Sequence, residues 1–179
     1  MLGGVGLAVS GIPRFLAASL FIIDLYVICG ILHADGLADL ADALVTGGTH
    51  KERTEVMKDE KTGAAGLITI LAVNLLLFSS LVELFSLNES LFVFLAIVVA
   101  EVLSREAMVS VMFFGKSAHE GLGSTFVEKI SSVTWGVGTL FVILVLGLFR
   151  GPLAYVALGL ALLVSFVATR LGNRVIGGI

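Results

Sequence analysis

The sequence is poor in charged residues, and this shortage excludes an ordinary soluble domain. Only 14% of the 179 residues are charged, 11 of them basic and 14 acidic, whereas 58% are hydrophobic. Soluble domains carry about 25% charged residues, so this chain has too little polar sequence to cover a large soluble core. Together with a mean hydropathy of +1.08, the composition predicts an all-α integral membrane protein.

Cysteine and N-terminal basic residues are also scarce. The single cysteine, Cys29, lies inside an apolar run, which excludes a disulfide framework and leaves the redox compartment open. In the N-terminal segment "MLGGVGLAVSGIPR", no basic residue stands ahead of the apolar residues, which argues against a cleaved signal peptide. The net charge of −3 gives no sign of nucleic-acid binding, so nucleic acid is not an expected partner.

Five apolar stretches are candidates for membrane spans. A helix rises 1.5 Å per residue, so about 20 residues cross a hydrocarbon core of about 30 Å. We therefore expect a single helical membrane domain over residues 1–179, with about five transmembrane helices and short amphipathic helices at the cytoplasmic face. The candidate spans are Phe15–Leu32, Ala64–Phe85, Leu91–Phe114, Val133–Phe149 and Leu153–Thr169.

The basic residues of the connections lie almost all on one side of the predicted spans. Two, Arg14 and Arg150, fall on the opposite side. By the positive-inside rule, the basic side is cytoplasmic, which predicts a protein of the cell (inner) membrane whose active face is cytoplasmic. The basic side holds Lys51, Arg53, Lys58, Lys61, Lys116, Lys129, Arg170 and Arg174.

Three acidic residues follow the first span, in "ILHADGLADLADALVTGG" (residues 31–48). In a helix that continues the span, Asp35, Asp39 and Asp42 fall within about 60° of one another on one face. This spacing predicts an amphipathic helix with an acidic stripe at the lipid boundary. Thr49 and Glu52 then match a capping box, which predicts a second short helix over about residues 50–60.

The acidic stripe allows two interpretations. It could simply be a solvated helix face, but like charges at i, i+4 destabilise a helix by about 0.2–0.5 kcal/mol each. No lysine or arginine lies between Arg14 and Lys51 to relieve them. Carboxylates suit a hard divalent cation such as Mg²⁺, which is often completed by water and a substrate phosphate. We therefore predict that Asp35, Asp39 and Asp42 form a metal site.

Other polar residues near the predicted site have open roles. His33 is either an interfacial packing residue or a catalytic group. Arg53, Lys58 and Asp59 precede Gly63; the basic side chains would neutralise phosphate oxygens, or they would only anchor the chain at the cytoplasmic face.

The third predicted span contains ionisable residues, which are costly in lipid. Arg105 and Glu101 stand at i, i+4 and are expected to pair with each other. Functional and structural explanations of Arg105 both stay open.

Four polar segments together resemble a known family. "GILHADGLADLADAL" and "ERTEVMKDEKTGAAG", then Ser104-Arg105 and "EGLGSTF", resemble the motifs of the cobalamin synthase (adenosylcobinamide-GDP ribazoletransferase) family, in the same order. The chain departs from the pattern at Leu40, Ala43 and Ala118, where Thr, Gly and Arg are usual. By the same resemblance, family segments are expected to be missing at both ends.

The resemblance implies the joining of adenosylcobinamide-GDP with α-ribazole, or with its 5′-phosphate, to give adenosylcobalamin (or its phosphate) and GMP. It implies a membrane-bound, Mg²⁺-dependent enzyme, and it leaves the oligomeric state, a homo-oligomer included, open. Asp35, Asp39 and Asp42 would hold Mg²⁺ on the pyrophosphate, while Asp59 or His33 acts as the base. The substrate-binding residues would be Arg53, Lys58, Gly63, Arg105, Gly121 and Gly123.

Two other functional classes remain as alternatives. An ion-coupled transporter would use Asp24, Glu101 and Arg105, but the fourth and fifth predicted spans have almost no polar residues at mid-depth. A CDP-alcohol-type phosphotransferase would also use a set of acids with a metal, although the D-G-x-x-A-R core of that class is absent. A purely structural membrane subunit would tolerate loss of the acids.

Overall fold

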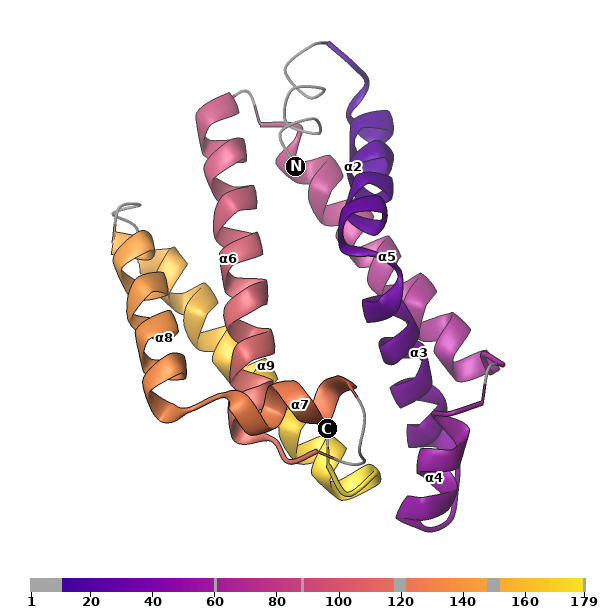
Figure 1. The fold of residues 1–179 in the computed structure, drawn as a ribbon. Coiled ribbons are helices and arrows are strands. Elements are labelled where there is room, and N and C mark those ends of the chain that lie inside the picture. The colour runs from indigo at the N-terminus through magenta and orange to yellow at the C-terminus, as the bar shows by residue number, and fades with distance from the viewer. Residues whose placement is uncertain (1–10, 60, 88, 118–121, 148–151, 179) are drawn as a thin grey trace. The chain divides into compact units, whose positions relative to one another are not determined.

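The chain is helical throughout the part that the structure describes. The structure is a computed structural model and describes residues 11–59, 61–87, 89–117, 122–147 and 152–178, among which there is no strand. The predicted all-α fold is therefore confirmed for this part. Its helices are α2 (Arg14–Cys29), α3 (Leu32–Val45), α4 (His50–Val56), α5 (Ala64–Leu84), α6 (Ser90–Phe114), α7 (Leu122–Lys129), α8 (Ser132–Gly147) and α9 (Pro152–Val175) (Figure 1).

Contacts divide the chain into two compact units, residues 1–96 and residues 97–179. In the first unit, α2 and α3 both pack against α5. The Tyr26 hydroxyl of α2 donates to Asn74 Oδ1 of α5 at 3.0 Å and accepts from its Nδ2 at 2.8 Å. Such interhelical hydrogen bonds stabilise helix pairs where no water is available, so this pair holds α2 on α5.

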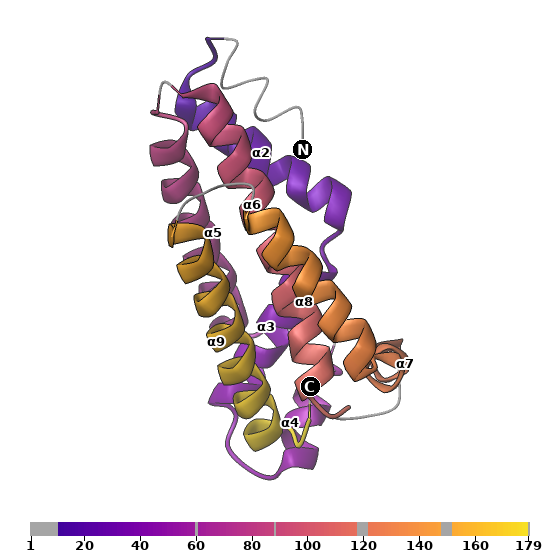
Figure 2. The same ribbon diagram turned by 90° about the vertical axis from the view of Figure 1, so that its left-hand side faces the viewer.

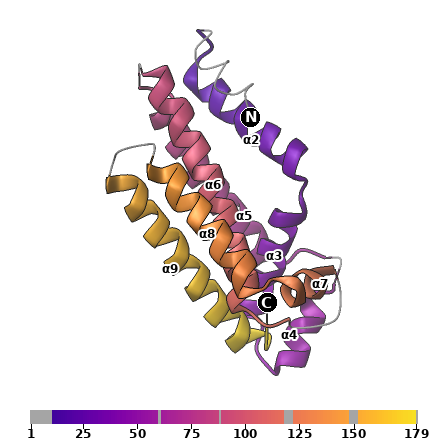
Figure 3. The same cartoon turned by 60° about the vertical axis from the view of Figure 1, so that its left-hand side comes forward.

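A sharp turn separates α2 from α3, where the sequence had predicted one continuous helix. Gly30 has a φ of 73°, a backbone region that glycine adopts without steric cost. The axes of the two helices differ by 93°, and Figure 3 shows the chain changing direction between them. The prediction of a straight continuation is wrong because Gly30 ends α2 after 16 residues, about 24 Å at 1.5 Å per residue.

Fewer helices have the properties of a membrane span than the five predicted. In the described ranges, α5 and α9 are long and apolar enough, and a third span is reached only if α2 and α3 count as one bent span. α8 is apolar but has 16 residues, and the 25-residue α6 carries Glu101, Arg105 and Glu106. Large side chains along α5, such as Leu67, Ile68 and Leu76, are 64–70% exposed. Apolar surface of this extent marks contact with lipid, so the chain is a helical membrane protein.

The second unit is built from α6, α8 and α9. Its buried core consists of Leu103 from α6, Val142 and Leu146 from α8, and Leu158 from α9. Figure 2 shows α8 and α9 side by side, and the two helices are in contact. The Ser165 hydroxyl of α9 also donates to the Ala107 carbonyl of α6 at 3.0 Å. This bond ties α9 to α6 at the level where α6 carries its polar residues.

A buried polar cluster joins α6 to α8. Glu106 is only 4% exposed, and its Oε1 accepts from the Thr139 hydroxyl at 2.8 Å and from the Ser110 hydroxyl at 3.3 Å. Trp135 Nε1 donates to Ser110 Oγ at 3.0 Å, and the Trp135 ring stacks on Phe113 with centroids 4.8 Å apart. A buried carboxyl group is costly without partners, so these bonds set the position of α8 on α6.

We expect Thr139→Val to destabilise the chain by about 1 kcal/mol, since interhelical hydrogen bonds in membrane proteins average about 0.6 kcal/mol and reach about 1.7. Valine keeps the shape of threonine but leaves Glu106 without its closest donor. Unfolding in mixed detergent micelles would measure the change. Thr134→Val is the matched control, because Thr134 is exposed on the same helix and should change stability by less. Equal effects of the two substitutions would contradict a role for the Glu106 cluster.

Candidate functional site

The acidic helix α3 is fixed to α5 through Asp42. Asp42 Oδ2 accepts from the backbone N–H of Gly63 at 2.7 Å, and Oδ1 accepts from that of Gly66 at 2.9 Å. The first amides of any helix lack intrahelical partners, and α5 has no capping side chain of its own at Gly63. Asp42, which is 9% exposed, therefore caps α5 from a different helix and lies in the packed interface rather than on a solvated stripe.

Gly63 and Gly66 make room for this carboxylate. A Cβ atom at Gly66 would lie 2.6 Å from Asp42 Oδ2 and 2.9 Å from the Ala38 carbonyl oxygen, and a Cβ at Gly63 would collide with the Asp42 carboxylate. The space beside Gly63, a predicted substrate-binding residue, is thus occupied by the Asp42 carboxylate.

Asp35 and Asp39 continue from Asp42 toward the N-terminus of α3. Asp35 is exposed and Asp39 is half-buried. Burial raises the pKa of Asp39 above its ordinary value, and repulsion from the like charges of Asp35 and Asp42 raises it further. Asp35 and Asp39 stand four residues apart on one helix face, and a cation between them would relieve this repulsion.

The three acids do not form a complete cage. Among the residues that the structure describes, no group of three His, Cys, Asp or Glu side chains is arranged to hold a metal ion. Asp42 uses both oxygens for backbone amides, which is the physical reason why it does not join the other two. What the structure presents is a pair of carboxylates, Asp35 and Asp39, beside a third that is engaged by α5.

The short helix α4 follows the acidic helix and packs against it. It begins with the predicted capping box: Glu52 N–H donates to Thr49 Oγ1 at 3.4 Å, and Thr49 N–H donates to Glu52 Oε2 at 2.6 Å. The helix runs over His50–Val56, shorter than the predicted 50–60. The capping box fixes where α4 starts and hence where Arg53 lies.

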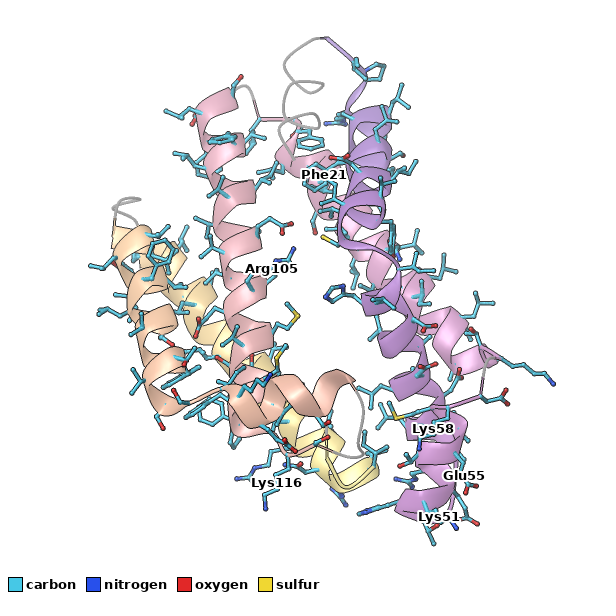
Figure 4. The ribbon with its side chains drawn as sticks, viewed as in Figure 1. Phe21, Lys51, Glu55, Lys58, Arg105 and Lys116 are labelled. Atoms are coloured by element: carbon cyan, nitrogen blue, oxygen red, sulfur yellow. The ribbon has the colours of Figure 1, made fainter. Side chains whose placement is uncertain are left out.

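α4 and the loop after it carry basic and acidic side chains in equal number, four of each over residues 50–61. Lys51, Lys58 and Glu55 are all exposed (labelled in Figure 4). Arg53 Nε is buried and has no hydrogen-bond partner among the described residues. A guanidinium group with a free donor is suited to an anionic oxygen. Asp59, in the following loop, is exposed and accepts from the Lys61 N–H at 3.2 Å.

We expect low pH to destabilise α4. Hydrogen bonds from the backbone and the hydroxyl of Thr49 lower the pKa of Glu52 from its ordinary value. Because the folded pKa is the lower one, the stabilisation of α4 by Glu52 is present at neutral pH and is lost as the pH falls through the folded pKa. Amide hydrogen exchange of α4 as a function of pH should show this loss in the wild type and in the exposed control Glu55→Gln, but not in Glu52→Gln. A wild-type profile without pH dependence in the acidic range would contradict the capping box.

The remaining predicted residues have different positions. His33 is exposed in the first turn of α3. Arg105 and Gly123 belong to the second unit; Arg105 pairs with Glu101 at 3.4 Å, as predicted, and Figure 4 shows it pointing away from α8. Gly123, a predicted substrate-binding residue, lies within α7. Gly121 lies outside the described residues.

Sequence reasoning missed the connection between Asp42 and the start of α5. One signal was available: α5 begins at glycine without a serine, threonine, aspartate or asparagine at its N-cap. Buried amides at such an end need an acceptor from elsewhere in the fold. The sequence indicates that an acceptor is needed but not which residue supplies it.

Several known proteins that share one name are similar to this chain. A protein of Methanococcoides burtonii named adenosylcobinamide-GDP ribazoletransferase is 31% identical over 95% of this chain and 65% of its own length. Proteins of the same name from Thermococcus kodakarensis and Azorhizobium caulinodans are 37% and 33% identical, over 75% and 97% of this chain and 54% and 67% of their own lengths. The chain thus spans between about half and two thirds of these relatives, and no solved structure matches it. Residues 1–179 match the cobalamin-5-phosphate synthase family as a whole, and the chain belongs to that family.

Proposed function

We propose that this chain acts in ribazole transfer, joining adenosylcobinamide-GDP to α-ribazole or its 5′-phosphate with release of GMP. The relatives named adenosylcobinamide-GDP ribazoletransferase support this reaction. The observation that carries the proposal is the Asp35–Asp39 carboxylate pair, held on α5 through Asp42 and followed directly by α4, which carries Lys51 and Arg53. This arrangement combines a cation-binding pair with donors for phosphate.

The residues present fit a magnesium ion. Mg²⁺ in phosphate-handling sites is usually held by one or two carboxylates, and water and substrate phosphate supply its other ligands. Asp35 and Asp39 supply two such carboxylates, and the like-charge repulsion on Asp39 favours a cation beside it. Mg²⁺ bound there would neutralise charge on the pyrophosphate oxygens. Asp42, the third predicted ligand, already uses both carboxylate oxygens for the backbone amides of Gly63 and Gly66.

The chemistry requires positioning and charge balance more than covalent participation of the protein. A hydroxyl oxygen of α-ribazole attacks the phosphorus that bears the corrinoid arm. A new P–O bond forms, the P–O bond to GMP breaks, and the hydroxyl proton passes to a base. Asp59 or His33 serves as this base; both are exposed and therefore accessible to a substrate.

Basic residues would balance the negative charge that develops during the transfer. Arg53 is the strongest candidate because its buried Nε has no partner in the described part of the chain. Lys58 is exposed in the loop after α4. Arg105, on α6, stays a substrate-binding proposal that the family resemblance implies. Gly63, Gly121 and Gly123 stay substrate-binding proposals; for Gly63, the amide is already engaged by Asp42.

We further propose that the active face is cytoplasmic and that the membrane is the inner membrane. The support is the distribution of the basic residues, eight of which fall on one side of the predicted spans. Five spans would require α6 and the short α8 to cross as well as α5, α9 and the bent pair of α2 and α3.

The test is GMP release by purified membranes that contain the chain, supplied with adenosylcobinamide-GDP, α-ribazole and Mg²⁺. We expect release that depends on α-ribazole and that EDTA stops and added Mg²⁺ restores. Membranes without the chain are the control. Lipid product without any requirement for corrinoid would instead indicate a CDP-alcohol-type enzyme, and release unaffected by EDTA would remove the magnesium site.

A further inference from the structure

We infer that Asp42 caps the N-terminus of α5 and holds α3 against it, and that it is not a third metal ligand beside Asp35 and Asp39. The inference deepens the proposed function and rests on it for the role of Asp35 and Asp39. It divides three similar acids on one helix into two that face a ligand and one that holds the helix in place.

The hydrogen bonds of Asp42 are the first reason for this inference. Each of its two carboxylate oxygens already accepts a backbone N–H, at 2.7 and 2.9 Å. Gly66 is the third residue of α5, and the amide at this position is one that an N-cap side chain ordinarily satisfies. Asp42 therefore replaces a missing local cap, and removing it would leave two amides at a packed interface without an acceptor.

The partial positive charge at the N-terminus of α5 is the second reason. The N-terminus of a helix behaves as roughly half a positive charge, and the two N–H groups point at the Asp42 carboxylate. A divalent cation at the same oxygens would be repelled by the end of α5. Asp35 and Asp39 lie further along α3 and become more exposed away from Asp42, so a cation can reach them without approaching α5.

The glycines at the start of α5, Gly63 and Gly66, are the third reason. A Cβ atom at Gly63 or at Gly66 would collide with the Asp42 carboxylate. Gly36, on the same helix as the acids, has open space around it. Glycine is therefore required at the start of α5 because the Asp42 carboxylate lies against it. This requirement does not depend on a substrate in contact with Gly63.

The experiment compares Asp42→Asn with Asp39→Asn in the detergent-purified 179-residue chain. Two measurements are made without substrate: Mn²⁺ binding by electron paramagnetic resonance, with Mn²⁺ as the probe for Mg²⁺, and the midpoint of thermal unfolding. For Asp42→Asn we expect a lower unfolding midpoint and a Mn²⁺ affinity within about threefold of wild type. For Asp39→Asn we expect Mn²⁺ affinity to fall at least about tenfold, in the range seen when groups at metal sites are lost, with no loss of stability.

Gly66→Ala supplies a second variant in case Asp42→Asn does not fold. This substitution keeps all three acids but displaces the Asp42 carboxylate from the start of α5. It should lower the unfolding midpoint with little change in Mn²⁺ affinity. Loss of Mn²⁺ binding in Asp42→Asn with an unchanged midpoint would overturn the inference, as would a wild-type chain that binds no Mn²⁺. Because neither measurement uses a corrinoid, a failure of GMP release would be distinguishable from a failure of this inference.

Discussion

Replacing Asp39 with asparagine should reduce the proposed Mg²⁺-dependent GMP release by about a hundredfold or more while leaving the fold at least as stable. A bound metal ion contributes several kcal/mol of charge stabilisation in a transition state, and each 1.36 kcal/mol is a factor of ten in rate. Removing the charge of Asp39 also ends its repulsion by Asp35 and Asp42. Like charges at i, i+4 cost about 0.2–0.5 kcal/mol each, so stability should stay the same or rise slightly.

The opposite signs of the two effects make this substitution informative. A structural acid would lose stability on neutralisation, whereas a ligand-binding acid that is strained by its neighbours would gain it. Glu55→Gln is the matched control, because Glu55 is an exposed acid on α4 outside the proposed site and should leave release and stability unchanged. Wild-type rates in Asp39→Asn, or a clear drop in its unfolding midpoint, would count against the metal site.

Gly66→Ala is expected to give the largest loss of stability, about 1–3 kcal/mol. Alanine in place of glycine inside a helix would by itself stabilise by up to about 1 kcal/mol. At this position its Cβ would lie 2.6 Å from Asp42 Oδ2 and 2.9 Å from the backbone carbonyl of Ala38. A backbone oxygen cannot move aside alone, so α3 must shift on α5, and overpacking of this kind costs about 1–3 kcal/mol. The clash therefore outweighs the gain in helix propensity.

Chemical or thermal unfolding in detergent would measure the loss, and Gly36→Ala provides the control. Gly36 lies within α3 with nothing close to its missing Cβ, so alanine there should be neutral or should stabilise by about 0.5–1 kcal/mol. If the two substitutions had the same effect, the close packing of α3 on α5 at Gly66 would be wrong.

Local features of the fold could be predicted from the sequence because they depend on residues close together in the chain. The capping box of Thr49 and Glu52 and the pair of Glu101 with Arg105 each join residues three or four positions apart. The apolar stretches over α5 and α9 gave correct helices because composition alone decides whether a segment favours lipid.

The prediction of one continuous helix over α2 and α3 failed because the backbone conformation of a single residue decides where α2 ends. A single positive φ at Gly30 divides a helix that the apolar pattern continues, because glycine is compatible with both conformations.

By itself, the sequence determined that this is a helical membrane protein, that three acids fall on one helix face, and which family it belongs to, because composition, helical periodicity and motif order are properties of the chain alone. Only the tertiary structure decided that Asp42 faces the amides of Gly63 and Gly66 while Asp35 and Asp39 stay accessible. The three acids are alike in type and spacing, and what distinguishes them is the helix end that packs against just one of them.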